Sequence, residues 1–471
     1  MTDHHHGGHG ARHVRLADLP RSEIGDHIWH PVRRALGATG FGVGAYSAAK
    51  AGDVLVGSHD ETGLGSNRHE ELYVVLRGRA LFELDGTELE LGPEEFLLVD
   101  AGTTRGARAL ADETSVLVVG GAPGAVTPAP YEHWYAALTA DRPEEAAEIA
   151  AAGLVDHPDH GQLNYQLACF RALAGEPDVA ARHLRRAVAS DERAWTWLED
   201  DHDLEALRSV PGAIPTRTKV GPIHVERAGS GPSVVLVHAG VADGRMWDTQ
   251  WVDWPATLDV TRLDLRGFGR SGAPEAPFSH AADVLGVLDA AGIERAILVG
   301  ASFGGRVVLD VAASRPDRVA GLVLACAALP DHEWSAAIQA FGAAEDEALE
   351  AGDLDRATEV NVDFWLPTAS DAVRAAIREQ QRRAFELQIA ADADEELLTD
   401  DLSSRLTALD MPALVLVGET DHADFQVIAE RLAAALPNAR RQTIAGSGHL
   451  PSLEQPAAFD AVVLPFIRSL S

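Results

Sequence analysis

The chain has 471 residues, which is too long for one ordinary hydrophobic core and predicts two or three domains. Hydrophobic residues make up 46% of it, enough for each domain to bury a core. Its 72 acidic against 39 basic residues give a formal net charge of −33, which repels phosphate backbones and anionic lipid and so excludes nucleic acid and membrane surfaces as partners. Its two cysteines, Cys169 and Cys326, fall in segments assigned below to different domains, so we expect no disulfide framework and a reducing, cytoplasmic compartment.

Residues 1–40 are predicted to be a tail and lead-in. The start, MTDHHHGGHGARHVRL, lacks the apolar run of a signal peptide, and no later run reaches the roughly 20 apolar residues of a membrane span. The cluster of His4, His5, His6 and His9 offers metal ligands, but a functionally idle tail or the remnant of a tag explains it better.

Residues 41–125 are predicted to be all-β. Short apolar runs recur there, namely DVLVGS, ELYVVLRG, ALFELDG, EFLLVD and SVLVVGG. Turn residues separate them, notably Asp85-Gly86 and Ala101-Gly102. Regular short strands with such turns predict a small barrel or sandwich.

Two stretches of this segment resemble the motifs of the cupin family over roughly 80 residues. In HEELYVVLRG, Glu71 and Gly78 keep the spacing of the glutamate and the glycine in the family's first motif. DAGTTR, from Asp100 to Arg105, occupies the end of the family's second motif. The resemblance implies a metal held by two histidines, the glutamate and a third histidine. Here the three histidine positions fall on Gly65, Asn67 and Arg105.

These departures favour a barrel without a metal. Only Glu71 remains of the four implied ligands, and a permanent guanidinium beside it suits an internal ion pair. His59 and His69 stay open as substitute ligands, because His69 and Glu71 are two apart and share a face of a strand. We expect no metal and no cofactor, and a barrel that serves as a small-molecule pocket or a dimerisation surface.

Residues 126–212 are Ala-rich, with apolar residues at helical spacing. NYQLACFRALAGEPDVAARHLRRAVASDE resembles one tetratricopeptide repeat, a helix–turn–helix unit broken at Gly175-Glu176-Pro177. One repeat cannot bury a continuous core alone, so we expect it to pack on the barrel as a spacer rather than form a peptide-binding groove. Because cupin-like barrels and single repeats often pair, the resemblance implies a homodimer.

Residues 213–471 alternate between buried strands and helices. SVVLVH, DVTRLDL, AILVG, AGLVLAC and ALVLVG are apolar without polar alternation, which is typical of a parallel sheet covered on both faces. Residues 330–408 interrupt this alternation with acidic helical sequence and are predicted to be a cap. Its aromatic residues, which would line a substrate pocket or belong to the core, are Trp334, Phe341, Phe364, Trp365 and Phe385.

The segment AILVGASFGGRVVL carries the strongest chemical signal. Gly300 to Gly304 read G-x-S-x-G between a strand and a helix, the pattern of a serine on a sharp turn that glycines make sterically possible. A serine nucleophile there, Ser302, needs a base and an orienting acid. His449 and Asp421 follow later strands in the expected order, and Asp424 remains the rival acid in the same loop.

An oxyanion hole needs two backbone N–H donors. Phe303, after the serine, is one candidate, and Val241, in VVLVHAGVADGRMW, is the other. His238 is interpreted as a structural hydrogen-bonding residue, and DLRGFGRSG as a loop that shapes the site rather than a phosphate cradle.

With these residues in place, residues 215–471 resemble an α/β-hydrolase. The resemblance implies an eight-stranded, mostly parallel sheet with a helical cap, and a serine at position 302 departs from the dehalogenase and epoxide-hydrolase branches. The chain is thus expected to be multi-domain, with a cupin-like barrel, a helical hairpin and an α/β-hydrolase domain.

The predicted function is a serine hydrolase that cleaves small carboxylic esters or lactones through an acyl-enzyme. C–C bond hydrolysis and perhydrolysis stay open within the same family. A non-enzymatic ligand sensor is the alternative of another class. A metal-dependent cupin enzyme is disfavoured by Gly65, Asn67 and Arg105.

Overall fold

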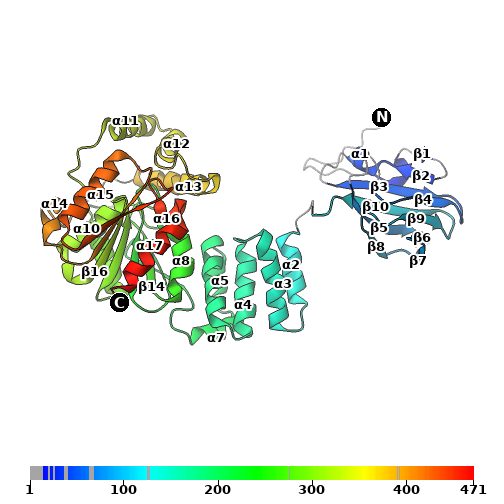
Figure 1. The fold of residues 1–471 in the computed structure, drawn as a ribbon, viewed down its shortest axis with the longest axis horizontal. Helices are drawn as coiled ribbons and strands as arrows, with labels where there is room; N and C mark the ends of the chain where they lie inside the picture. Colours follow the sequence, from blue (N-terminus) through cyan, green and yellow to red (C-terminus); the bar gives the residue numbers. More distant parts are fainter. Residues whose placement is uncertain are drawn as a thin grey trace. The chain divides into compact units, whose positions relative to one another are not determined.

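The structure is a computed structural model that describes residues 14–19, 22–24, 27–36, 41–62, 68–124, 128–274, 276–389, 391 and 393–470. The chain divides into two compact units, Met1–Pro128 and Ala129–Ser471. The helical segment and the α/β part therefore form one unit (Figure 1). Within the described residues, no helix is both long and apolar enough to cross a membrane.

The first unit contains two antiparallel sheets. One has six strands in the order β1 (Ser22–Ile24), β2 (His27–His30), β3 (Gly42–Ala48), β10 (Thr114–Gly121), β5 (Glu70–Arg77) and β8 (Phe96–Val99). The other has four in the order β4 (Val54–His59), β9 (Arg105–Ala109), β6 (Ala80–Leu84) and β7 (Thr87–Leu91). Leu55, Tyr73, Phe82 and Val116, drawn from both sheets, are buried together and form the core.

Each apolar run quoted from this segment forms a strand, and the Asp85-Gly86 turn has the positive φ angles, 45° and 83°, of a tight hairpin. Strands β3, β7 and β9 of the same segment also belong to the sheets. The predicted tail and lead-in contributes β1 and β2 to the larger sheet, where β2 pairs with β3. A short helix, α1 (Val32–Leu36), follows β2. The histidine cluster at residues 4–9 and the positions Gly65 and Asn67 lie outside the described residues.

The helical segment contains more than the single predicted hairpin. Its helices are α2 (Pro130–Leu138), α3 (Pro143–Asp156), α4 (Gly161–Leu173), α5 (Pro177–Ser190), α6 (Ala194–Trp197) and α7 (Glu205–Arg208). The α4–α5 hairpin turns at Gly175, as predicted, with φ at +80°. The preceding pair escaped prediction because α3 packs through small side chains, Ala146, Ala147 and Ala150, which give a weak apolar periodicity.

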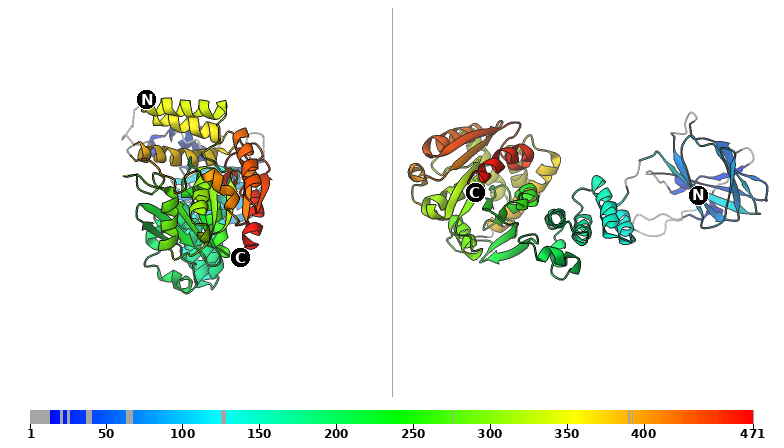
Figure 2. Two further views of the ribbon diagram at one scale, coloured as in Figure 1. Left: turned by 90° about the vertical axis from the view of Figure 1, so that its left-hand side faces the viewer. Right: turned by 60° about the horizontal axis from the view of Figure 1, so that its bottom comes forward.

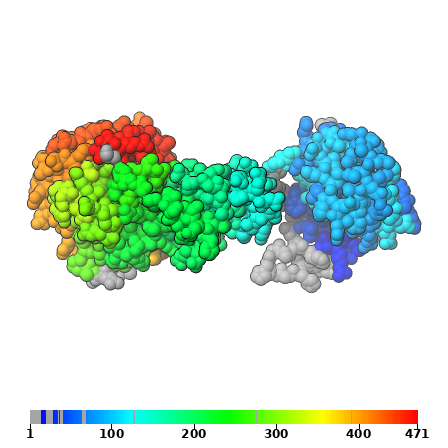
Figure 3. Space-filling model, turned by 90° about the horizontal axis from the view of Figure 1, so that it is seen from below, coloured from blue at the N-terminus to red at the C-terminus, as the bar shows by residue number. Residues whose placement is uncertain are grey.

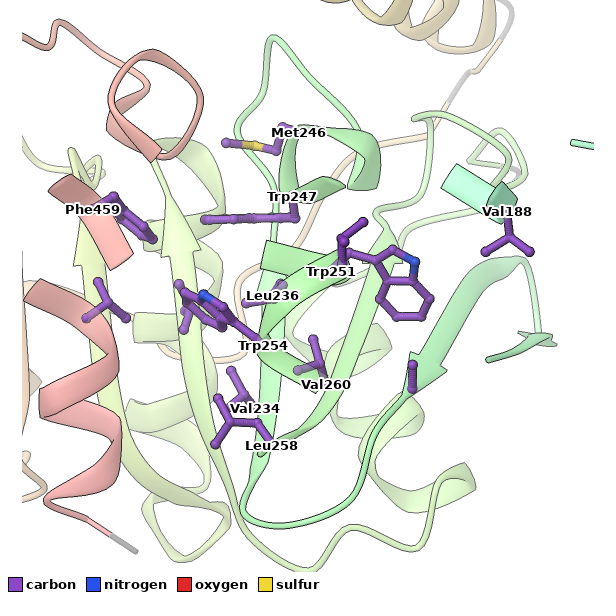
Figure 4. Packing of buried hydrophobic residues seen from close by; sticks show 14 of the residues in the cluster. Val188, Val234, Leu236, Met246, Trp247, Trp251, Trp254, Leu258, Val260 and Phe459 are labelled. Atoms are coloured by element: carbon purple, nitrogen blue, oxygen red, sulfur yellow. The ribbon is translucent and has the colours of Figure 1, made fainter. Parts of the chain in front are cut away.

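The expectation that this segment packs on the barrel is wrong, because its apolar face is buried against the α/β part. Helix α5 lies along α8 (Asp248–Asp253), where the Arg182 Nε lies 2.7 Å from the Asp253 Oδ1 and Arg185 donates to the Val252 carbonyl. Figure 4 shows Val188 of α5 beside Trp251 in the shared core. The two parts present a continuous surface in Figure 3.

The sheet of the α/β part has eight strands, as the family resemblance implied. Their order is β11 (Thr216–Val220), β12 (Ile223–Ala228), β14 (Asp259–Asp264), β13 (Ser233–Val237), β15 (Ala296–Ala301), β16 (Val319–Ala325), β17 (Ala413–Gly418) and β18 (Ala439–Ile444). Strands β13 to β18 pair in parallel, and β12 pairs antiparallel with both neighbours. Besides α8, the α-helices of this part outside the cap are α9 (His280–Ala290), α10 (Phe303–Ser314), α15 (Ala423–Ala435), α16 (Pro451–Glu454) and α17 (Pro456–Arg468).

The predicted cap forms between β16 and β17. It consists of α11 (Ala336–Glu350), α12 (Leu354–Trp365), α13 (Asp371–Gln388) and the short α14 (Leu402–Arg405). The left view of Figure 2 shows the long cap helices, in yellow, lying over one end of the α/β part. The loops that follow the parallel strands meet the cap there, so this end carries the candidate site.

Candidate active site

Ser302 occupies the turn between β15 and α10 with a strained backbone, φ 50° and ψ −113°. The two motif glycines explain how this turn is possible. A Cβ at Gly300 would lie 2.4 Å from the Gly304 carbonyl oxygen, and one at Gly304 would lie 2.4 Å from the His238 carbonyl oxygen. Only glycine at both positions lets the strand and the helix approach this closely.

The structure brings together the three residues that the sequence nominated as a triad. The His449 Nε2 lies 2.9 Å from the Ser302 Oγ, and the His449 Nδ1 lies 2.9 Å from the Asp421 Oδ1. Because Nδ1 faces a carboxylate, the neutral imidazole carries its proton on Nδ1. Nε2 is then free to accept a hydrogen bond from the Ser302 hydroxyl. His449 and Asp421 are both buried.

The rival acid, Asp424, has different partners. Its Oδ1 accepts hydrogen bonds from the His332 Nε2 at 3.0 Å and from the Ser335 N–H at 2.8 Å. Burial opposes its ionisation, but the hydrogen bonds from Ser335 and His332 leave the pKa of Asp424 below its ordinary value. Asp424 therefore fastens the start of the cap, whereas Asp421 contacts His449.

Two features that sequence reasoning missed hold the His449 loop. The Glu454 carboxylate accepts hydrogen bonds from the N–H groups of Gly448 and Leu450, both at 2.9 Å, so it clamps the backbone on either side of the histidine. The rings of Trp365 and Phe425 pack on the imidazole, with centroids 4.4 and 4.3 Å away. The signal for Glu454 was a carboxylate five residues after the histidine, in GHLPSLE.

The two candidate oxyanion donors lie at the same cavity as Ser302. Phe303 begins α10, where a backbone N–H has no acceptor within the helix, and the Val241 N–H has no acceptor among the described residues. Their loops are in contact, since a Cβ on Gly240 would lie 3.3 Å from the Phe303 Cβ. The arrangement leaves two N–H donors beside the serine.

His238 makes the structural hydrogen bonds that the sequence suggested. Its Nε2 accepts from the Leu265 N–H at 2.9 Å, and its Nδ1 donates to the Ala239 carbonyl at 2.8 Å. Burial lowers the pKa of this imidazole and keeps it neutral. It thereby ties the loop after β13, which carries Val241, to the end of β14.

The DLRGFGRSG loop is tied to the loop after β13 through Asp264. The Asp264 carboxylate accepts hydrogen bonds from the Gly244 N–H at 2.8 Å and the Arg270 N–H at 2.7 Å. Burial, and then the nearby Asp243 charge, raise the pKa of Asp264. This side chain joins two loops, and its contacts are with backbone groups of the protein, consistent with the predicted shaping role.

A cavity of about 560 Å³ opens at the serine, beneath the cap. Four of the five cap aromatics named from the sequence line it, namely Trp334, Phe341, Trp365 and Phe385. Phe364 instead stacks on His422, with ring centroids 4.1 Å apart. The cavity has the size of a small-molecule site, and aromatic side chains form part of its wall.

Arg306 lies on the wall of this cavity and steadies Phe303. Its Nη2 lies 2.7 and 2.6 Å from the two Glu395 carboxylate oxygens, and its guanidinium lies 4.4 Å from the Phe303 ring. The ion pair largely neutralises this cation, so Arg306 is better suited to hold the loop than to attract an anion.

Three groups of the described residues place potential metal-ligating atoms together. Cys326, Asp421 and His449 form one, in which Asp421 and His449 already belong to the hydrogen-bonded chain to Ser302. Burial and the Asp421 charge raise the pKa of the Cys326 thiol well above its ordinary value. Cys169 also has a pKa raised by burial, in a second group with Asp201 and Asp203.

The third group, His59, Glu61 and Glu71, lies in the first unit. The Arg105 Nε lies 3.6 Å from the Glu71 Oε2, so the predicted ion pair is confirmed, and the Arg105 side chain is fully buried. Glu71 also accepts hydrogen bonds from His59 at 3.2 Å and from the Tyr73 hydroxyl at 2.5 Å. A buried fixed cation and two donors already meet the Oε2 of this carboxylate.

Residues 232–456 match the family described as alpha/beta hydrolase fold. The C-terminal part of the chain therefore belongs to the alpha/beta hydrolase family, in agreement with the sheet and the serine turn described above.

Relatives match over about half of the chain. It is similar to the carboxylesterase YbfK of Bacillus subtilis, 25% identical over 54% of this chain and 87% of that protein. It is also similar to the pimeloyl-[acyl-carrier protein] methyl ester esterase of Aeromonas hydrophila, 28% identical over 52% and 99%. It is also similar to the polyketide synthase ThaQ of Burkholderia thailandensis, with 32% identity over 51% of this chain. That match covers only 12% of the length of the polyketide synthase.

Proposed function

We propose that this protein is a serine hydrolase that cleaves small carboxylic esters or lactones through an acyl-enzyme. One observation carries the proposal: a continuous hydrogen-bond chain runs from Asp421 through His449 to Ser302, with 2.9 Å at each step, and ends at a cavity of about 560 Å³. Two relatives that match over most of their own length bear the names of esterases, which supports the same reaction class.

In the first half of the proposed reaction the Ser302 Oγ attacks the substrate carbonyl carbon while His449 Nε2 takes the hydroxyl proton. Asp421 keeps the imidazole oriented and stabilises its protonated form. The N–H groups of Phe303 and Val241 hold the oxyanion of the tetrahedral intermediate. Its collapse breaks the bond to the alkoxide, which leaves with the proton from His449.

In the second half, water enters the vacated space and His449 removes its proton. The hydroxide attacks the acyl-serine carbonyl, the same two N–H groups hold the second oxyanion, and the acid departs as Ser302 regains its proton. A lactone follows the same steps, except that its alcohol remains tethered to the acyl group.

The test is labelling of the purified protein with a fluorophosphonate probe beside the Ser302→Ala variant, together with hydrolysis of short and long p-nitrophenyl esters. We expect the parent alone to be labelled and to hydrolyse esters, with the variant slower by at least about 10³-fold. A well-folded parent that is neither labelled nor active would overturn the proposal and favour a ligand-binding receptor.

A further inference from the structure

The cap cavity changes character with distance from the catalytic histidine. Near His449 its wall is aromatic: Trp365 lies 4.4 Å from the imidazole, and Phe341 lies 5.2 Å from Trp365. Glu345 follows Phe341 by four residues on α11, and Asn361 precedes Trp365 by four on the antiparallel neighbour α12. Both polar residues line the same cavity, one helical turn, about 5.4 Å, beyond the aromatic pair.

Glu345 and Asn361 contact each other. The Asn361 Nδ2 donates a hydrogen bond to the Glu345 Oε2. It also donates to the Ala357 carbonyl, at a distance of 3.0 Å. One carboxyl oxygen of Glu345 therefore remains for another donor, and burial raises the pKa of Glu345. This end of the cavity offers acceptors in a poorly hydrated setting.

Gln381 of α13 completes the polar end. Its side chain is only 4% exposed, it lines the cavity, and its Oε1 is buried without a hydrogen-bond partner among the described residues. The other glutamines of this helix stretch are occupied: Gln380 accepts from the Asp243 N–H, and Gln388 donates to the Gly267 carbonyl. A buried amide oxygen without a partner costs stability, and rotation about the last side-chain bond exchanges the oxygen and the nitrogen of the Gln381 amide. Because this side chain lines the cavity, the rotation presents the oxygen to a ligand that can donate to it.

We propose that the substrate carries a neutral hydrogen-bond donor, an amide N–H or a hydroxyl, at the end of a short apolar spacer, and that Gln381 and Glu345 recognise it. The inference rests on the proposed ester or lactone hydrolysis and names its substrate class. The apolar spacer lies along Phe341 and Trp365 while the carbonyl carbon faces Ser302. The donor then reaches the polar end one helical turn further on.

Matched ester series test this specificity in the full chain. One series carries a terminal primary amide on the acyl part of p-nitrophenyl esters, and a second carries it on the alcohol part of acetate esters followed by pH-stat titration. Each is compared with alkyl esters of equal length over a range of spacer lengths. We expect one series to show a kcat/KM preference for the amide of at least about tenfold, peaked at one spacer length.

The variant Gln381→Met keeps the size and helix propensity of the side chain but removes the amide. It should lower the amide-over-alkyl preference by at least about tenfold and raise the turnover of alkyl esters. Gln388→Met, on the same helix with its amide already bonded, is the matched control and should change both ester types in parallel. Esters ending in trimethylammonium or carboxylate should show no preference.

The outcomes separate the two proposals. Hydrolysis of alkyl esters without an amide preference in either series, or with a preference that Gln381→Met leaves intact, overturns this inference alone. A stronger preference for trimethylammonium than for amide also overturns it, because Glu345 would then act as a charge. A parent without any ester turnover or fluorophosphonate labelling removes the proposed function, and this inference falls with it.

Discussion

Two of the histidine–carboxylate pairs in the described residues, one in each unit, differ in what the second ring nitrogen meets. In the α/β part, His449 pairs with Asp421 at 2.9 Å and turns Nε2 to the Ser302 hydroxyl. In the first unit, His59 pairs with Glu71 at 3.2 Å, and its Nδ1 lies 2.7 Å from the Gly57 carbonyl.

The difference is chemical as well as geometric. Both nitrogens of His59 face acceptors, so the protonated ring satisfies both contacts. The hydrogen bond to Glu71 raises the pKa of His59 despite burial. His449 keeps one nitrogen as an acceptor at a cavity. A histidine and a carboxylate make a general base only where the outer nitrogen faces a hydroxyl.

The largest expected effect separates the two pairs directly. His449→Gln should reduce kcat/KM for p-nitrophenyl butyrate by about 10⁴-fold, because no base remains for Ser302. His59→Gln is the matched substitution in the other pair and should leave ester hydrolysis as in the parent. Steady-state kinetics of both purified variants decide this; a comparable loss in His59→Gln would give the first unit a part in the reaction.

A second contrast lies within the α/β part. Asp421→Asn should reduce kcat about 10³-fold, since an amide cannot stabilise the imidazolium that forms on His449. Asp424→Asn removes a carboxylate bonded to His332 and Ser335 and should cost less than about tenfold, with the effect mainly on thermal stability. Kinetics with circular-dichroism melts distinguish the two; the reverse ranking would make Asp424 the acid of the triad.

The ion pair of the first unit predicts an effect on stability instead. Arg105→Met leaves Glu71 without its buried counter-charge and should destabilise the unit by about 3 kcal/mol. Adding Glu71→Gln should recover a large part of this loss, because the remaining buried group is then neutral. Hydrogen exchange of the β5 and β9 peptides, followed by mass spectrometry, measures both; equal stability of Arg105→Met and the parent would contradict the pairing.

Much of the α/β part could be predicted from the sequence because its signals are local. Strands buried on both faces read as continuous apolar runs, and the serine turn needs Gly300 and Gly304 next to the residue they serve. Asp421 and His449 each follow a strand, and they come after Ser302 in the order acid and then histidine, which is the order expected for a triad in this fold. These parts required no knowledge of packing between distant segments.

The remaining features depend on contacts that no local pattern encodes. Glu454 clamps the His449 loop through two backbone N–H groups, and backbone donors leave no trace in the sequence. The choice between Asp421 and Asp424 depended on the position of His332, some ninety residues away. The packing of α5 on α8 was missed because Val188 and Trp251 read as apolar residues of separate helices.

The smallest predicted effect is a pH dependence of the first unit, with its sign fixed by His59. The hydrogen bond to Glu71 raises the pKa of His59 above its ordinary 6.5, so the pair stabilises the fold fully below that value and the contribution is lost as the pH rises through the folded-state pKa. Burial opposes ionisation of Glu71, but bonds from His59 and Tyr73 leave its pKa below the ordinary value, so acidification removes the pair only at low pH.

Protection of the β5 peptide against hydrogen exchange should therefore fall as the pH is raised from below 6.5 to well above it, after correction for the intrinsic exchange rate. His59→Gln should flatten this dependence, because glutamine does not titrate. His69→Gln is the control, since no described residue forms an ion pair with His69, and it should keep the slope of the parent. An unchanged slope in His59→Gln would mean that His59 is neutral in the folded state, and the contrast with His449 would then rest on geometry alone.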